Sequence, residues 1–456
     1  MKTLSVKKGL PVSVAGAPMP GVEKGADVSS VAFLPDILPA LKPRLLVKNG
    51  DTVKIGTPLF KDKNNPDLLF LSPGGGIITD IRYGHRRAIS RIVIQTGRTE
   101  DHEQFDPVDK EQLAAMDRGE MISTLMARGL WGFIRNLPYR SIPTADETPA
   151  SLWVSLDPSD PFQVPSSVYL EGNESLFAYG VKVLERLGAP VFVCESLGSE
   201  VSHESVAPLI THRISGAYPA EDPGVVLYHT KTSPRENHAW FISGQDVLML
   251  AEGLSTGRYP ISRIVSISGS ISGPQEGNGT AAPVGRYVKT RIGAPLASLV
   301  NEAAAGENRR WITGGLFRGR TVPEDDYLGL NETSLLIAID AGDPELFGFL
   351  RPGLKKPTAS RAFLYALHKK PFAPLTDMHG EERACINCGK CQAVCPVDIM
   401  VPFAYKSVYA GEIEDALAHG LLDCVVCGLC SFVCPAKIEL AETFESTRHA
   451  YHQDRI

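Results

Sequence analysis

The sequence predicts a multidomain α/β and β protein made of four parts: a small β-barrel, a Rossmann-like α/β domain, a β-rich α+β domain and a C-terminal α-helical domain. Three observations carry this prediction. Short strand patterns separated by glycine turns fill residues 44–94. Helical and strand patterns alternate over residues 118–250. Eight of the nine cysteines lie in two short runs, 385–395 and 424–434.

Composition excludes several classes of protein. The chain has 456 residues, 43% hydrophobic and 21% charged, as in a soluble globular protein of roughly two to four domains. A net charge of −6 argues against a nucleic-acid binder, and none is expected as a partner. No apolar run reaches the ~20 residues of a membrane span, and the start "MKTLSVKKGLPVSVAG" lacks a signal peptide's apolar core. A cytoplasmic location is therefore expected, where clustered cysteines are metal ligands rather than disulfides.

The strand patterns of residues 44–94 are built on glycine turns. In "LLVKNGDTVKIGTPLF" the turn pair Asn49-Gly50 and the turn at 56–58 separate alternating apolar positions. The segment "LLFLSPGGGIITDI" repeats the arrangement around 74–76, and "ISRIVIQTG" ends it. These phrases resemble the biotinyl/lipoyl-type barrel. Residues 1–100 are assigned to an N-terminal segment and this barrel-sandwich domain.

The next part, residues 101–255, is predicted to be a parallel α/β layer. The patterns "GEMISTLMARGLW", "NESLFAYGVKVLERLG" and "QDVLMLAEGLSTG" are helical, and "SLWVSL" and "PVFVCES" between them are strands. Cys194 lies on one of these strands and is expected to be a buried small hydrophobe.

The chain returns to β patterning in residues 256–350, assigned to a β-rich α+β domain. Its strands are "SRIVSISGS", "RYVKTRIG", "RRWITGGLFRG" and "TSLLIAID". The glycine-rich stretch 269–279 lacks the spacing of a phosphate loop and is interpreted as turns. Residues 351–380 form a basic linker or helix, and residues 381–456 the last domain.

Each cysteine run has the spacing C-x2-C-x2-C-x3-C-P: "CINCGKCQAVCP" at 385–396 and "CVVCGLCSFVCP" at 424–435. Iron–sulfur clusters take four thiolates, and in two-cluster ferredoxins the fourth cysteine of a run binds the other run's cluster. We therefore assign two [4Fe–4S] clusters with crossed ligands. Cys385, Cys388, Cys391 and Cys434 are expected to hold the first, and Cys424, Cys427, Cys430 and Cys395 the second.

The rival interpretation of the eight cysteines is a pair of zinc sites. Zinc ribbons need only two CxxC pairs, so the third cysteine and the proline of each run would be unexplained. The segment between the runs, "VPFAYKSVYAGEIEDALAHGLLD", has a helical pattern that Gly411 breaks in two. This favours an α-helical ferredoxin domain over the small βαβ type.

Nearly the whole chain resembles the A subunit of the sodium-translocating NADH:quinone reductase (Nqr). The resemblance rests on "VKKGLPVSVAGAP", "LLVKNGDTVKIGTPLFKDKNNP", "RGLWGFIRNLPYRSIP", "FISGQDVLMLAEGLSTGRYPISRIVSISG" and "ELFGFLRPGLKKPTASRAFL". The chain is similar to the C subunit of the Rnf complex as well, and both families share ancestry with the flavin subunit of respiratory complex I.

Two departures separate this chain from its relatives. Flavin-binding relatives carry a glycine-rich loop whose amides hold the FMN phosphate, whereas residues 129–143 here contain bulky Trp131, Phe133, Ile134 and Tyr139. FMN is therefore not expected in this chain. Familiar members of the Nqr family have lost most of the cluster cysteines, but this chain keeps all eight in an intact two-cluster ferredoxin tail, as the C subunit of Rnf does.

The resemblance implies a peripheral subunit on the cytoplasmic side of the bacterial inner membrane. Electrons would pass from NADH to quinone with export of Na+, and the partners would be membrane subunits B, D and E and subunits C and F. It implies no complete active site in this chain alone, and contact with quinone is possible. Two alternatives stay open: an NADH dehydrogenase module with FMN like the C subunit of Rnf, or a non-redox scaffold with vestigial or zinc-bound cysteines.

A basic stretch precedes the last domain. Residues 351–370 contain six Lys or Arg and no acidic residue: Arg351, Lys355, Lys356, Arg361, Lys369 and Lys370. Basic residues among apolar ones suit anionic lipid headgroups, so this stretch is predicted to lie against the membrane surface or a membrane subunit.

Overall fold

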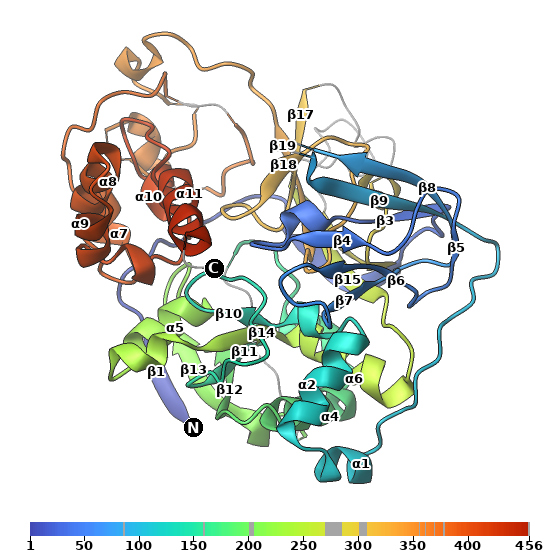
Figure 1. Cartoon of the computed structure of the whole chain (residues 1–456). Coiled ribbons are helices and arrows are strands. Elements are labelled where there is room, and N and C mark those ends of the chain that lie inside the picture. Colours follow the sequence, from blue (N-terminus) through green and yellow to red (C-terminus); the bar gives the residue numbers. More distant parts are fainter. Residues whose placement is uncertain are drawn as a thin grey trace.

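The computed structural model describes residues 1–84, 87–157, 160–199, 205–269, 285–300, 308–354, 356–360, 362–368, 370–376 and 379–454. Four parts follow one another as predicted and pack into one body (Figure 1). The stretch 270–279 and three of the basic residues, Lys355, Arg361 and Lys369, lie outside the described residues, so the interpretation of that stretch as turns stays a prediction.

Two small sheets packed face to face form the barrel-sandwich. One sheet has the order β3-β9-β8-β5 and the other β4-β6-β7. Phe33 of the first sheet meets Phe60 and Phe70 of the second, with ring centroids 5.2 and 5.8 Å away, and this aromatic contact fills the core. The strands are β3 (Ser30–Phe33), β4 (Pro43–Leu45), β5 (Thr52–Val53), β6 (Pro58–Asp62), β7 (Leu69–Leu71), β8 (Gly76–Tyr83) and β9 (Ile89–Thr96).

The α/β domain contains a six-stranded sheet in the order β1-β13-β12-β11-β14-β10. All neighbours are parallel except β10 and β14. Its strands are β1 (Lys2–Ser5), β10 (Arg135–Asn136), β11 (Leu152–Ser155), β12 (Val191–Ser196), β13 (Ile210–Ser215) and β14 (Trp240–Ser243). The helices are α1 (Lys110–Ala115), α2 (Arg118–Ala127), α3 (Ser166–Tyr169), α4 (Glu174–Glu185), α5 (Pro223–Thr230) and α6 (Gly244–Thr256).

Successive side chains of β11 point to opposite faces of the sheet and show which elements cover each face. Leu152 and Val154 belong to the core that includes α4 and α6, whereas Trp153 belongs to a second core with α5. That second core also contains Cys194, which is 6% exposed as expected of a small buried hydrophobe, and many residues after 395. The C-terminal domain therefore packs on the α5 face of the sheet.

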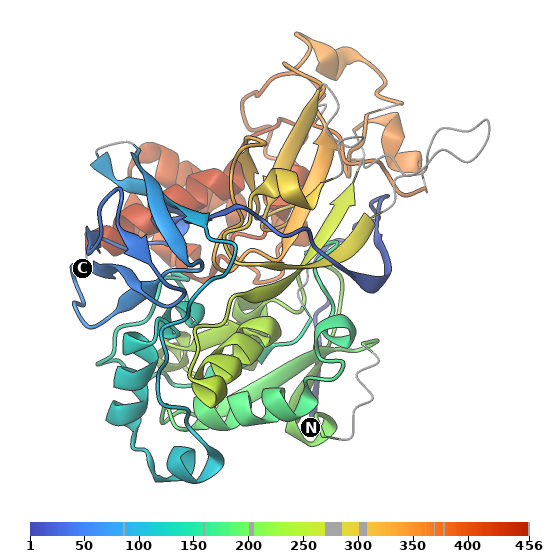
Figure 2. The same cartoon turned by 90° about the vertical axis from the view of Figure 1, so that its right-hand side faces the viewer.

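The β-rich domain is a mixed sheet in the order β18-β17-β19-β15-β16-β2. The strands are β2 (Pro18–Lys24), β15 (Ser262–Gly269), β16 (Gly285–Arg291), β17 (Arg309–Thr313), β18 (Arg320–Val322) and β19 (Ser334–Ile339). The N-terminal segment that precedes the barrel thus contributes β1 to the α/β sheet and β2 to this one. Figure 2 shows this N-terminal segment crossing the molecule.

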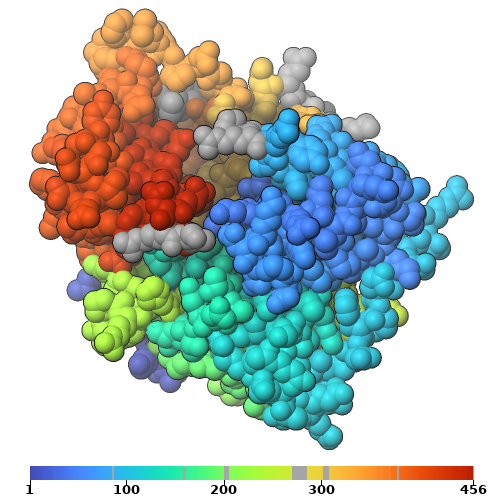
Figure 3. Space-filling model, in the orientation of Figure 1, coloured from blue at the N-terminus to red at the C-terminus, as the bar shows by residue number. Residues whose placement is uncertain are grey.

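The C-terminal domain, called the tail here (residues 381–456), is helical. Its helices are α7 (Lys390–Val394), α8 (Val401–Ala410), α9 (Ile413–Ala418), α10 (Leu429–Phe432) and α11 (Leu440–Gln453). Gly411 ends α8 with φ of 80°, a left-handed conformation that glycine adopts without strain. The predicted break into two short helices is confirmed. Figure 3 shows the tail on one side of the molecule, next to the barrel and above the α/β domain.

Candidate functional site

Both cysteine runs fold into the same backbone shape. We call residues 385–391 the first cysteine loop and residues 424–430 the second. The residue before the second cysteine of each loop has positive φ (Asn387 at 54°, Val426 at 51°), and a left-handed glycine follows that cysteine. Positive φ at Val426 is strained because valine is β-branched. Such strain is typical of a loop whose shape is fixed by what it binds.

The shared geometry continues past the fourth cysteine. The third residue after it also has positive φ in both runs, at Asp398 (52°) and Lys437 (58°). A short helix carries the third cysteine of each loop, α7 for Cys391 and α10 for Cys430. The two halves of the tail are thus structural repeats, as their spacing predicts.

The structure brings the eight thiols together in two groups of four. Cys385, Cys388, Cys391 and Cys434 line one small cavity with Ile386 and Pro402. The other four thiols also lie near one another. Cys395 and Cys424 interact electrostatically with each other, and each interacts with Cys427 and Cys430. In each group the fourth cysteine comes from the opposite run. The assignment of these two groups as cluster ligands stays a prediction.

Burial raises the pKa of four of these thiols, which favours their protonated form. It raises the pKa of Cys391 and Cys395 to about 11 and that of Cys427 to about 12, and it raises the pKa of Cys430 further. Thiolates are the metal-binding form, so loading the site must displace protons that burial holds in place.

The donor set fits iron–sulfur chemistry. Each group offers four soft sulfur ligands, and the fourth position is closed by a cysteine rather than left open. Within the described residues, no three His, Cys, Asp or Glu side chains converge closely enough to hold a single metal ion. Four thiols spread around a small volume are what a cluster requires.

A larger cavity of about 460 Å³ lies where three domains meet; we call it the junction cavity. It opens at the carboxyl ends of β11 and β14, beside Ser155 and Ser243. These strands flank the point where strand order reverses, the usual ligand crevice of a parallel sheet. The barrel and the β-rich domain complete its walls with Ile37, Leu38, Thr313 and Arg318.

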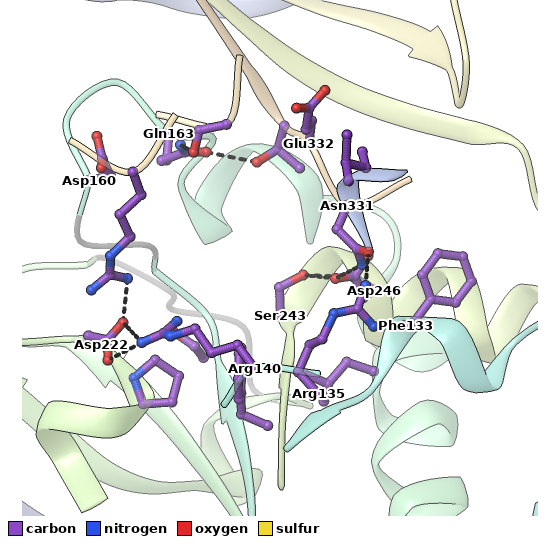
Figure 4. Close-up of a pocket in the computed structure, with 18 of the residues that line it drawn as sticks. Phe133, Arg135, Arg140, Asp160, Gln163, Asp222, Ser243, Asp246, Asn331 and Glu332 are labelled. Atoms are coloured by element: carbon purple, nitrogen blue, oxygen red, sulfur yellow. Dashed lines mark hydrogen bonds and ion pairs between the residues drawn. The ribbon is translucent and has the colours of Figure 1, made fainter. Parts of the chain in front are cut away.

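Two polar groups face each other across the junction cavity (Figure 4). On one side Arg140 donates to both oxygens of Asp222 at 2.8 Å. On the other, Ser243 donates to Asp246 at 2.7 Å, and Asp246 also accepts from Asn331 at 3.2 Å. The cavity therefore combines apolar walls with polar groups at two ends, as small-molecule sites do.

Asp222 is ionised despite being 3% exposed. Burial by itself would raise its pKa, but Arg140 and Arg318 outweigh burial and lower the pKa to about 2. Opposite, burial lowers the pKa of Arg135 to about 10. Asp222 and Arg135 are therefore both charged at neutral pH.

The bulky residues that replace the flavin loop are part of the core. Trp131 and Ile134 are fully buried, and Trp131 packs edge-on against Trp240 with ring centroids 5.3 Å apart. Phe133 instead reaches the wall of the junction cavity. Tyr139 stacks on His452 of α11 at 3.9 Å between ring centroids. The segment thus fills space that a glycine loop would leave open.

The sequence is similar to those of known proteins over nearly its whole length. The chain is 32% identical over 92% of both chains to the A subunit of the Na(+)-translocating NADH-quinone reductase of Pasteurella multocida (strain Pm70). It is likewise 32% identical over 92% of both chains to that of Actinobacillus pleuropneumoniae serotype 5b (strain L20).

The chain belongs to the NqrA family, the A subunits of Na(+)-translocating NADH-quinone reductases. Models of the NqrA N-terminal barrel-sandwich hybrid domain and of the NqrA second alpha/beta domain match residues 4–97 and 116–259. A 4Fe-4S dicluster domain model matches residues 375–438, so the predicted family and fold class are confirmed. A solved NAD+-reducing [NiFe]-hydrogenase shares 13% identity over 76% of this chain and 68% of its own, with a TM-score of 0.37, a likeness too slight to indicate more.

Sequence reasoning missed several residues around the second cysteine loop. Tyr218, Asp222, Arg318 and Arg448 are scattered over more than 200 positions and match no motif. Nothing local marks them, because their importance comes from packing against a loop that is distant in sequence.

Proposed function

We propose that this chain is the peripheral A subunit of a complex that transfers electrons from NADH to quinone and exports Na+. In this proposal its tail holds two [4Fe–4S] clusters. The observation that carries the proposal is the pair of four-thiol groups in matching strained loops. When bound, such clusters supply one-electron transfer at potentials set by charge, hydrogen bonding and exposure.

The proposed ligands of the first cluster are Cys385, Cys388, Cys391 and Cys434, and those of the second are Cys424, Cys427, Cys430 and Cys395. Cys385 and Cys388 are exposed, whereas Cys395, Cys427 and Cys434 are buried. The first cysteine loop thus offers the surface for electron exchange with another subunit, and the second loop faces the body of the chain.

The remaining steps need other subunits. With Trp131, Phe133 and Ile134 filling the flavin-loop position, we propose that this chain binds no FMN and receives electrons from a flavin-carrying partner, the F subunit. Quinone reduction and Na+ movement would take place with subunits B, C, D and E. If this chain itself contacts quinone, the junction cavity of about 460 Å³ has room for a ring-sized ligand.

We further propose attachment to the cytoplasmic face of the membrane through residues 351–370. Among the described residues, no helix is both long and apolar enough to span a bilayer. The described part of this stretch, which we call the exposed arm, combines exposed residues with buried Thr358, Ser360 and Phe363. It follows the 3-10 helix Gly348–Leu350 and contains the 3-10 helix Leu364–Leu367, at the top of Figure 2. Leu354 is 66% and Leu367 78% exposed, and Arg351 and Lys370 at the two ends of the stretch are exposed as well.

Cluster content is the direct test of this function. After anaerobic purification of the full chain we expect about eight irons and eight sulfides per chain. Cys391→Ser should remove the signal of one cluster, and Cys395→Ser should damage the cluster of the other run. Zinc without iron would reject the redox role and support the scaffold alternative.

A second candidate, a flavin-containing NADH dehydrogenase module, is favoured by one observation, the junction cavity at the sheet's switch point. The absorption spectrum of the purified chain separates the two. A stoichiometric flavin band that persists after gel filtration would support this candidate, and its absence with clusters present would support the relay subunit.

A further inference from the structure

The second cysteine loop is held by three side chains from distant parts of the chain. Arg448 of α11 donates to the carbonyl of Cys424 at 2.6 Å. Tyr218 donates to the carbonyl of Cys427 at 2.8 Å, and Arg318 to that of Val426 at 3.3 Å. Three carbonyls within four residues are thus each bonded by a side chain from outside the loop.

These donors bring positive charge to a buried place. Arg448 is 4% exposed, and its other contacts include the carbonyl of Pro138. Arg318 pairs with Asp222, which also binds Arg140. Arg448 and Arg318 therefore bring guanidinium groups directly to the second cysteine loop, and the carboxylates of Asp222, Asp160 and Glu445 lie around them.

Close packing keeps the donors in place. The ring of Tyr218 stacks on Phe317 with centroids 4.8 Å apart, and Phe317 packs edge-on against Phe432 of the tail at 5.3 Å. A side chain at Gly428 would come within 2.9 Å of the Phe317 carbonyl oxygen. The loop is thus fitted against the β-rich domain as well as against α11 and the α/β domain.

The first cysteine loop has no equivalent surroundings in the part of the chain that is described. Its contacts come from within the tail: the backbone N–H of Asn387 donates to the Cys385 sulfur at 3.4 Å, and the Lys406 ammonium donates to the side-chain oxygen of Asn387 at 3.5 Å. Ile386 is 69% exposed. The two loops share one backbone shape, but only the second has its own carbonyls bonded by Tyr218, Arg318 and Arg448 among the described contacts.

We propose that Tyr218, Arg318 and Arg448 are positioning residues that hold the second cysteine loop and raise the reduction potential of the cluster it binds. The inference rests on the proposed function, because it requires that the tail holds two clusters. Reduction adds one negative charge to a cluster. Positive charges and hydrogen-bond donors that are buried beside the cluster stabilise this added charge more than donors exposed to water do. The first cluster serves as the reference within the same molecule, because its surroundings, which include Arg383 at the Pro435 carbonyl, are left unchanged by substitutions at Tyr218 and Arg448.

Arg448→Gln tests the charge. The full chain is titrated electrochemically while the two cluster signals are followed by EPR, with Cys391→Ser used to assign each signal. We expect the equilibrium constant for reducing the second cluster to fall about tenfold, equal to about 59 mV for one electron, with the first cluster unchanged. Arg448→Lys, which keeps the charge, should restore most of the potential.

Tyr218→Phe tests the hydrogen bond without removing the ring that stacks on Phe317. It should shift the potential of the second cluster in the same direction but by a smaller factor. The matched control is Arg82→Gln on the exposed face of β8, where Arg82 pairs with Asp80, and neither potential should change.

Three results would overturn the inference. They are an unchanged second potential in Arg448→Gln, equal shifts of both clusters, or an Arg448→Lys shift as large as that of Arg448→Gln. If Arg448→Gln loses the second cluster, Tyr218→Phe and Arg448→Lys still decide between these outcomes. Iron analysis of the wild-type chain separates failure of this inference from failure of the proposed function. A wild-type chain without clusters would contradict the proposed function, whereas a chain with both clusters allows the inference to be tested.

Discussion

At the scale of single residues, Asp222 joins the α/β domain to the β-rich domain. It binds Arg140 and Arg318, and its Oδ1 also accepts from the amide of Gly224 at 2.8 Å to cap α5. Asp222→Asn should lower the free energy of unfolding by about 3–5 kcal/mol because two buried cations lose their partner. Urea unfolding measures this. Glu23→Gln, whose side chain is 60% exposed and pairs with Arg286, should change it by less than about 1 kcal/mol.

We expect the contribution of the Asp222 carboxylate to the free energy of unfolding to depend on pH. The folded state lowers its pKa to about 2 from an ordinary value of 3.8, so the unfolded state binds the proton more readily. The stability it contributes is complete above about pH 4 and is lost as pH falls toward about pH 2. The difference in unfolding free energy between wild type and Asp222→Asn should be flat from neutral pH to about pH 4 and shrink below. A difference that stays constant down to about pH 2 would contradict this assignment.

At the scale of elements, the β8–β9 hairpin depends on Gly76. Gly76 pairs with Thr96, and a side chain there would overlap the carbonyl oxygen of Gln95. Gly76→Ala should destabilise the chain by about 1–3 kcal/mol through overpacking. In Gly84→Ala the nearest atom lies 3.7 Å away, so this control should behave as wild type in the same urea titration.

At the scale of the whole molecule, the exposed arm predicts membrane attachment. Replacing Leu354 and Leu367 together by Gln should weaken co-sedimentation with anionic vesicles severalfold, because less apolar surface enters the lipid interface. Leu46→Gln, on an exposed leucine of the barrel (46%), should leave binding unchanged. Undiminished binding of the double variant would remove the arm from the membrane contact.

The sequence by itself determined whatever depends on local spacing. The cysteine intervals, the glycine turns of the barrel, the break at Gly411 and the alternation of strands and helices were all readable, because each involves residues a few positions apart. The family resemblance followed from the same continuous phrases.

Only the tertiary structure decided what surrounds those motifs. In the folded chain β1 and β2 pair with the α/β sheet and the β-rich sheet, and a cavity lies at the junction of three domains. The tertiary structure also placed Tyr218, Arg318 and Arg448 on one cysteine loop and left the other exposed. The two runs are nearly identical in sequence pattern, so their difference comes from burial and charge contributed by residues far along the chain, which no local pattern encodes.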